Sequence, residues 1–350
     1  MSETHNGAHD WVRALLFAAG ASLAGCGSTH HGATPAAEEA GTDGGVVLDA
    51  SEDGDSAPAL PPGSPPIPPV TGACPTLATG NVTVMGQSVQ LWVGTKQANV
   101  KGPVLFYWHG TGSTSNEASL LFANAIQDIT SEGGIVASFS TSTMQGMNTG
   151  NNVWYTGDFA MADQILACAV QQLNIDTKRI YTGGCSAGGL QAGAMLFERS
   201  SYLAAVMTNS GGRVFSYQFQ DSHTPPLITT HGAMGVDVVI IDFSGASGIL
   251  DDDIVARGGF AVDCNHMGGH CGAPKDDLAA MWQFCKDHPF GVSPEPYAHG
   301  LPASFPSYCT IITPPSDAGA EAEAGPAIDA AAEAEASVAP DAGARDAKGD

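Results

Sequence analysis

The chain has 350 residues, a length that accommodates one large domain or two small ones. It carries 36 acidic and 12 basic residues, which gives a formal net charge of −24. Only 18 acidic and 9 basic residues lie between Cys74 and Thr313, so the two ends of the chain hold most of the excess negative charge. Acidic ends of this kind are typical of unfolded, solubilising segments. A chain without a basic patch is not expected to bind nucleic acid.

The beginning of the chain contains a short apolar run, residues 14–26, that ends in Cys26. This run is too short to span a bilayer as a helix, and it has the composition of a signal-peptide core. Residues 23–26 read Leu-Ala-Gly-Cys and resemble a bacterial lipobox, in which the cysteine is lipidated. Only Arg13 is basic here, so a plain secretory signal and a buried helix remain the alternatives. We predict a signal peptide with a lipobox over 1–26, an extracytoplasmic protein, and membrane contact only through lipid on Cys26.

Two further segments have the composition of disordered chain. Residues 27–73 are rich in Gly, Ala, Asp, Ser and Pro, and residues 61–69 favour extended polyproline II. Residues 313–350 are rich in Ala, Asp and Glu and lack the large apolar side chains that a core requires. We therefore predict a disordered linker over 27–73, a folded domain over 74–312 and a disordered acidic tail over 313–350.

The folded domain begins with a predicted β-hairpin, followed by alternating strands and helices. The predicted elements of this first half are strands at 82–84, 89–93, 103–108, 134–138 and 179–181 and helices at 116–129 and 158–170. Asp158 is expected to cap the second helix, and Asp163 is expected to be a structural group on its surface. This alternation predicts an α/β fold, with a mostly parallel sheet and helices on both faces.

The strand at 179–181 leads into the sequence Gly184-Cys185-Ser186-Ala187-Gly188, and a helix is predicted at 190–199. A strand, a G-x-S-x-G turn and a helix form the nucleophile elbow of an α/β-hydrolase; an ordinary glycine-rich turn is the alternative. The turn must be sharp to expose the Ser186 hydroxyl, and the flanking glycines leave room for the helix to pack on the strand.

An oxyanion hole is expected beside Ser186. The residue after the nucleophile supplies one N–H, here that of Ala187. The other N–H comes from a His-Gly-Thr-Gly turn at 109–112, which follows a central strand. Thr111 and Gly110 are the alternatives for this second donor.

Strands at 204–208 and 226–230 are predicted after the elbow helix. The triad acid belongs in the loop after such a strand, and we predict Asp237 for this role; the alternative is a helix N-cap. Asp242 and residues 251–253 are rivals that we expect to face solvent.

A last strand at 260–264 precedes a glycine-rich loop that carries His270, the predicted catalytic base. His266 and His270 have the spacing of a helical zinc pair, but Gly268 and Gly269 lie between them and disfavour a helix. We therefore predict neither a metal nor an organic cofactor. A closing helix at 276–288 is expected to place Met281, Trp282 and Phe284 in the core.

Eight cysteines in an exported chain suggest disulfides, and lipidation of Cys26 would leave an odd number. Cys185 precedes the predicted nucleophile and Cys271 follows the predicted base. If Ser186 and His270 are within hydrogen-bonding distance, these two cysteines are close enough for a bridge; two independent core cysteines are the alternative. Cys74 with Cys168 and Cys264 with Cys309 are among the pairings that the sequence leaves open.

These motifs resemble those of the secreted polyhydroxybutyrate depolymerase and feruloyl esterase branch of the α/β-hydrolases. The Cys-Ser, Asp and His-Cys arrangement is similar to that of feruloyl esterases and tannases, in which the flanking cysteines are bridged. The matching residues are 109–112, 154–158, 184–189, Asp237 and 268–271. Asp237 lies six residues after His231, which departs from the usual spacing of the acid. The large lid domain of tannases has no counterpart here, which favours the compact depolymerase type.

The resemblance implies a monomeric serine esterase that acts through an acyl-enzyme on polyesters or on aromatic or polysaccharide-linked esters. Trp154, Tyr155 and His266 are the candidate substrate-binding residues. A serine peptidase or acyltransferase of the same fold is one alternative. A catalytically inactive surface module that binds polymer is the other.

Overall fold

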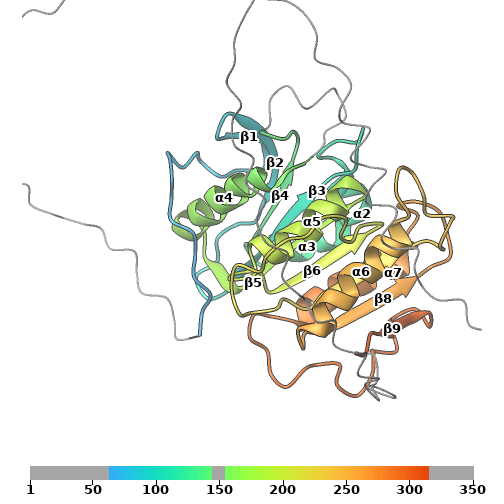
Figure 1. Cartoon of the computed structure of the whole chain (residues 1–350). Helices are drawn as coiled ribbons and strands as arrows, with labels where there is room; N and C mark the ends of the chain where they lie inside the picture. Colours follow the sequence, from blue (N-terminus) through green and yellow to red (C-terminus); the bar gives the residue numbers. More distant parts are fainter. Residues whose placement is uncertain (1–62, 144–153, 315–350) are drawn as a thin grey trace, which may run out of the picture. The chain divides into compact units, whose positions relative to one another are not determined.

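A nine-stranded sheet runs through the described part of the chain, residues 63–143 and 154–314 of a computed structural model (Figure 1). The strands are β1 Gly80–Val84, β2 Gln87–Val93, β3 Gly102–Trp108, β4 Ile135–Phe139, β5 Ile175–Cys185, β6 Ala205–Asn209, β7 Leu227–His231, β8 Ala261–Asn265 and β9 Cys309–Ile311. They lie side by side in the order β1-β2-β4-β3-β5-β6-β7-β8-β9. β3 to β8 pair in parallel, whereas β1, β2 and β9 pair antiparallel at the two edges. This confirms the predicted mostly parallel sheet.

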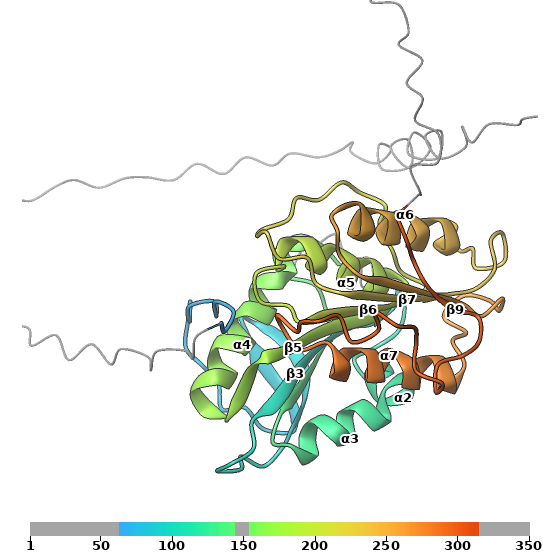
Figure 2. The same ribbon diagram turned by 90° about the horizontal axis from the view of Figure 1, so that it is seen from below.

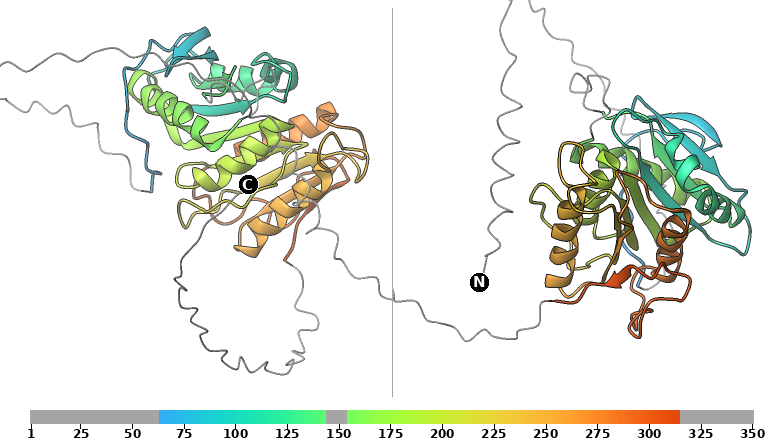
Figure 3. Two further views of the ribbon diagram at one scale, coloured as in Figure 1. Left: turned by 45° about the horizontal axis from the view of Figure 1, so that its top comes forward. Right: turned by 90° about the vertical axis from the view of Figure 1, so that its right-hand side faces the viewer.

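Helices cover both faces of the sheet (Figures 2 and 3). They are α2 Glu117–Leu121, α3 Ala123–Ser131, α4 Phe159–Gln172, α5 Ala187–Glu198, α6 Phe243–Ala256 and α7 Lys275–Asp287. One apolar core joins α4, α5 and α6 to the sheet, and a second core joins α2, α3 and α7 to its other face. All seven residues of β3 are buried, as expected for a central strand between two helical layers. The predicted core residues Met281, Trp282 and Phe284 of α7 are buried.

Several predicted elements differ in detail. The helix expected at 116–129 is interrupted at Phe122, whose ψ of 37° is not helical, and so forms α2 and α3. Asp158 occupies the N-cap position of α4, but its side chain makes no capping bond; it accepts hydrogen bonds from Thr143 and from the Tyr155 N–H instead. The sheet does not end with the strand at 260–264, because β9 adds an antiparallel edge strand tied to β8 by a Cys264–Cys309 disulfide.

Part of the predicted linker packs against the domain. In the described residues from Gly63 onward, Pro65 is buried and Ile67 packs against the apolar core that α4, α5 and α6 share with the sheet. Gln164 of α4 accepts two hydrogen bonds from Thr71 and donates one to the Gly72 carbonyl. Residues 63–73, which were predicted to be disordered linker, therefore pack against the domain that was predicted to begin at Cys74. Residues 1–62 and 315–350, which include Cys26 and the predicted tail, lie outside the described residues.

The environment of Asp251 differs from the predicted one. We expected it to face solvent, but it lies on the sheet-facing side of α6 and is 2% exposed. Thr229 of β7 donates a hydrogen bond to its carboxyl group at 3.0 Å. Asp163, by contrast, is the structural group that was predicted, because it pairs with Arg199 and accepts a hydrogen bond from Tyr202. No helix in the described ranges is both long and apolar enough to cross a membrane.

Candidate active site

The turn between β5 and α5 holds Ser186 in a strained backbone conformation. Its φ is 58° and its ψ is −124°, a region that non-glycine residues rarely adopt. The Ser186 N–H donates to the Asn209 carbonyl at 3.0 Å, which anchors the turn to β6. A Cβ on Gly188 would lie 1.8 Å from the Trp108 carbonyl oxygen, and one on Gly184 would lie 2.4 Å from the same atom. Only glycine at both positions therefore allows α5 to approach the sheet this closely.

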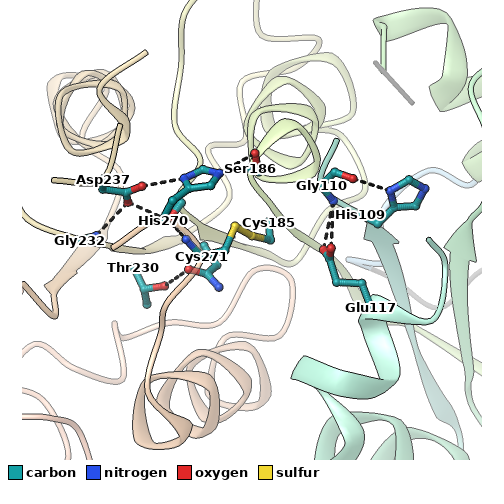
Figure 4. Close-up of a disulfide and its surroundings, with 12 residues drawn as sticks. His109, Gly110, Glu117, Cys185, Ser186, Thr230, Gly232, Asp237, His270 and Cys271 are labelled. Carbon is teal, nitrogen blue, oxygen red and sulfur yellow. Dashed lines mark hydrogen bonds and ion pairs between the residues drawn. A yellow bond between two sulfur atoms is a disulfide. The ribbon is translucent and has the colours of Figure 1, made fainter. Parts of the chain in front are cut away.

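Three side chains from distant parts of the chain meet at this turn (Figure 4). The Ser186 Oγ lies 2.8 Å from the His270 Nε2, and the His270 Nδ1 lies 2.7 Å from the Asp237 Oδ1. Asp237 follows β7 and His270 follows β8, so the carboxyl ends of neighbouring parallel strands bring them together. Asp237 is fully buried, whereas His270 and Ser186 are partly exposed. The arrangement has the geometry of a nucleophile, a base and a group that orients the base.

Hydrogen bonds stabilise the ionised form of the Asp237 carboxylate although this residue is buried. Burial alone would raise its pKa, but bonds from His270, the Gly232 N–H and the Ser210 hydroxyl lower the pKa below its ordinary value. The Gly232 N–H lies 2.9 Å and the Ser210 Oγ 2.7 Å from the Asp237 Oδ2. Both carboxylate oxygens are therefore occupied, and the Oδ1 is aimed at His270.

Ser210 is a site residue that the sequence analysis missed. It is fully buried at the end of β6, with a positive φ of 44°, and its N–H donates to the Thr230 carbonyl at 2.7 Å. Its hydroxyl donates to Asp237 and accepts the Cys271 N–H at 2.8 Å, so it connects the acid loop to the base loop. Only its position in the sequence could have indicated this role, because Ser210 directly follows β6, the strand next to β5.

A disulfide joins Cys185 to Cys271, with Cα atoms 6.0 Å apart (Figure 4). It links the residue before Ser186 to the residue after His270, as the sequence analysis predicted. Cys74–Cys168 and Cys264–Cys309 are also bridged, and Cys285 is a buried free thiol. Burial raises the pKa of Cys285 far above its ordinary range, so this thiol stays protonated.

The His-Gly-Thr-Gly turn lies beside the nucleophile, because a Cβ on Gly110 would be 3.2 Å from the Ser186 Cβ. The Gly110 N–H, however, already donates to the Glu117 carboxylate at 3.1 Å, and the Tyr107 hydroxyl donates to the same carboxylate at 2.8 Å. The Gly110 N–H is therefore not free to bind an oxyanion, because it already donates to Glu117. Thr111 is the remaining candidate in this turn, together with Ala187 at the first position of α5.

The candidate substrate-binding residues have different environments. Trp154 is 8% exposed; its Nε1 donates to the His109 carbonyl at 2.8 Å and its ring packs edge-on against Trp108. Trp154 therefore stabilises the turn at 109–112, and its burial does not fit the predicted role in substrate binding. Tyr155 is 37% exposed and remains available at the surface. The His266 Nδ1 accepts the Gly268 N–H, and burial lowers the pKa of His266 even though Asp277 and Asp237 oppose the shift.

A second histidine–carboxylate pair lies behind the acid loop. The His231 Nε2 is 2.7 Å from the Asp263 Oδ1, on neighbouring strands β7 and β8. Burial alone would lower the pKa of His231, but the hydrogen bond to Asp263 and the charge of Asp263, together with the Gly232 carbonyl and the charge of Asp237, raise the pKa overall. His231 directly precedes Gly232, whose N–H holds Asp237, so this pair fixes the start of the acid loop.

The fold is shared with solved structures of low sequence identity. The structure titled pOPH native has a TM-score of 0.53 and 15% identity, and the match covers 69% of this chain and 97% of that one. The structure titled sOPH native has a TM-score of 0.51, 19% identity and coverages of 68% and 97%. A complex of a pOPH variant with pNPB has a TM-score of 0.54, 16% identity and coverages of 71% and 99%. No protein-family model and no curated protein sequence matches the chain. The strand order, the turn at Ser186 and the similarity to these structures show that the chain has an α/β-hydrolase fold.

Proposed function

We propose that the protein is a serine hydrolase of carboxylic esters that works through an acyl-enzyme. The observation that carries this proposal is the unbroken chain of hydrogen bonds from Ser186 through His270 to Asp237, with Ser186 in a strained elbow. A buried ionised carboxylate, an imidazole and a partly exposed hydroxyl in this order are the groups that nucleophilic acyl transfer needs.

In the proposed mechanism the His270 Nε2 removes the proton from the Ser186 hydroxyl as its oxygen attacks the ester carbonyl. Asp237 keeps the imidazole in the required tautomer and stabilises its charged form. The N–H groups of Ala187 and Thr111 stabilise the oxyanion, aided by the positive end of α5. His270 then protonates the leaving alcohol, and later activates the water that hydrolyses the acyl-enzyme.

The finer proposals concern substrate and location. By the resemblance to depolymerases and feruloyl esterases, the substrate is a polyester or an aromatic or polysaccharide-linked ester, taken up by a monomer without a cofactor. The three disulfides favour an oxidising compartment outside the cytoplasm. A signal peptide with a lipobox would deliver the chain there and anchor it through Cys26.

Covalent labelling with a fluorophosphonate tests the proposal. We expect one equivalent of label on Ser186 and rapid turnover of p-nitrophenyl butyrate, and we expect neither in the Ser186→Ala protein. A folded wild-type protein that resists the label would be an inactive binding module. Faster turnover of a peptide p-nitroanilide than of the matching p-nitrophenyl ester would instead indicate a peptidase.

A further inference from the structure

The carboxylate of Glu117 lies against the His-Gly-Thr-Gly turn and takes no part in the proposed acyl transfer (Figure 4). Its Oε1 accepts the Gly110 N–H at 3.1 Å and the Tyr107 hydroxyl at 2.8 Å, and its Oε2 lies 3.3 Å from the same Gly110 nitrogen. A Cβ on Gly110 would lie 3.6 Å from the Glu117 Oε2 and 3.2 Å from the Ser186 Cβ. Glu117 and the proposed nucleophile therefore both lie beside Gly110.

Other hydrogen bonds fix the turn next to this contact. The His109 carbonyl accepts the Trp154 Nε1–H at 2.8 Å, and the Gly110 carbonyl accepts the Ser113 N–H at 3.0 Å. The Thr111 N–H, by contrast, donates no hydrogen bond to any residue that the structure describes. At the proposed oxyanion hole this N–H is thus available, whereas the Gly110 N–H is occupied.

The Glu117 carboxylate is itself held in place between β3 and α2. Glu117 is the first residue of α2, and its N–H donates to the Thr114 carbonyl at 2.9 Å. Tyr107 of β3 is fully buried, and its ring lies 5.7 Å from that of Phe122. Burial, reinforced by the charge of Glu117, raises the pKa of Tyr107 well above its ordinary value, so the hydroxyl stays protonated and donates to Glu117. Two rigid elements therefore determine where the carboxylate meets the turn.

We propose that Glu117 is a positioning residue for the oxyanion hole: its bond to the Gly110 N–H orients the turn so that the Thr111 N–H points to the oxyanion formed at Ser186. This inference rests on the proposed ester hydrolase function and adds a residue to it. A donor stabilises the oxyanion only within about 2.7–3.1 Å, so a small rotation of the turn is enough to lose the bond. Because the oxyanion exists only during the reaction, this loss lowers kcat and leaves KM nearly unchanged.

The experiment removes the bond between Glu117 and Gly110 by itself. Glu117→Ala alone would leave the buried Tyr107 hydroxyl without its partner, so the comparison is made in the Tyr107→Phe background. On p-nitrophenyl butyrate, we expect kcat of Tyr107→Phe/Glu117→Ala to be about 10- to 100-fold below that of Tyr107→Phe, with KM within about twofold.

A second readout reports on the oxyanion directly. The Ser186 Oγ adds to the carbonyl carbon of an alkyl trifluoromethyl ketone, its proton passes to His270, and the carbonyl oxygen becomes an oxyanion in the same site. Inhibition by this ketone should weaken in Tyr107→Phe/Glu117→Ala by the same factor as kcat. A merely structural role of Glu117 would not link these two quantities.

Two control variants keep an acceptor for the Gly110 N–H. Tyr107→Phe retains the Glu117 carboxylate, and Glu117→Gln retains an amide oxygen in place of Oε1, so both should have kcat within about threefold of wild type. Unchanged kcat in Tyr107→Phe/Glu117→Ala would overturn the proposal. A raised kcat would also overturn it, because the released Gly110 N–H would then be the better oxyanion donor. A wild type that neither turns over the ester nor takes up the fluorophosphonate would instead contradict the ester hydrolase function itself.

Discussion

Ser210 holds the carboxylate of Asp237 on the oxygen that His270 does not use. Its hydroxyl has one proton to give and accepts one backbone N–H, and both bonds are made inside the protein. The bond to Asp237 fixes the rotation of the carboxylate about its side chain, so that the Oδ1 stays aimed at the imidazole. Ser210 is thus a positioning residue that acts through Asp237 without touching the reacting atoms.

Ser210→Gly removes this hydroxyl and also relieves the positive φ at this position. We expect kcat to fall roughly 10- to 100-fold with little change in KM, since a hydrogen bond to a charged group contributes about 1.5–3 kcal/mol. Steady-state kinetics on a soluble ester measure the split, and thermal denaturation checks the fold. A stable Ser210→Gly protein with normal kcat would exclude the positioning role.

Asp237→Asn tests the assignment of the acid. An amide cannot stabilise the imidazolium and favours the wrong tautomer, so kcat should fall by about 10⁴-fold. Asp242→Asn is the control, because Asp242 caps α6 through the Ser244 and Gly245 N–H groups. That change should cost about 1 kcal/mol of stability or less and leave kcat close to normal. The reverse pattern of rates would assign the acid to Asp242.

At the scale of elements, the predictable features are those that the chain specifies locally. Strand, glycine-flanked serine and helix are contiguous around Ser186, and the fold then fixes where the acid and base loops lie. Ser210, by contrast, has no local motif, because its role depends on two loops that pack around β6. The commitment of the Gly110 N–H to Glu117 likewise depends on where α2 packs, which no spacing in the sequence reveals.

The packing of α6 on β7 gives the stability a pH dependence through Asp251. Burial, reinforced by the charge of Asp263, raises the pKa of Asp251 well above its ordinary value. The folded state therefore binds this proton more tightly than the unfolded state does. The resulting stabilisation is complete below the ordinary pKa of about 3.9 and is lost as the pH rises towards the raised value, by about 1.4 kcal/mol per pH unit.

Asp251→Asn should remove this dependence, because asparagine is neutral at every pH and still accepts the bond from Thr229. We expect the free energy of unfolding of the variant, relative to wild type, to increase as the pH rises from 4, measured by urea denaturation at each pH. Asp252→Asn, at the exposed neighbouring position, should show no such trend. A constant difference between Asp251→Asn and wild type across this range would mean that Asp251 is ionised throughout.

At the scale of the whole molecule, the three disulfides each join a different pair of segments in the described domain. Cys74–Cys168 attaches the entering chain to α4, and Cys264–Cys309 attaches the edge strand β9 to β8. Cys185–Cys271 closes the loops that carry Ser186 and His270 across a separation of 86 residues. The composition of residues 63–73 indicates an extended linker. Composition cannot show that this segment bonds to Gln164, a buried side chain on α4, because that contact depends on where the helix packs.

A chain that begins at Gly63 should therefore be more stable than one that begins at Cys74. The longer chain keeps three hydrogen bonds to Gln164 and the packing of Pro65 and Ile67, which together contribute roughly 2–4 kcal/mol. Both chains retain the Cys74–Cys168 disulfide, so denaturation in urea measures the segment alone. Gln164→Ala should cost about 1–2 kcal/mol in the longer chain and less in the shorter one, because the Thr71 and Gly72 groups that bond Gln164 are absent there. Equal stability of the two chains, or an equal cost of Gln164→Ala in both, would show that residues 63–73 lie against α4 without stabilising it.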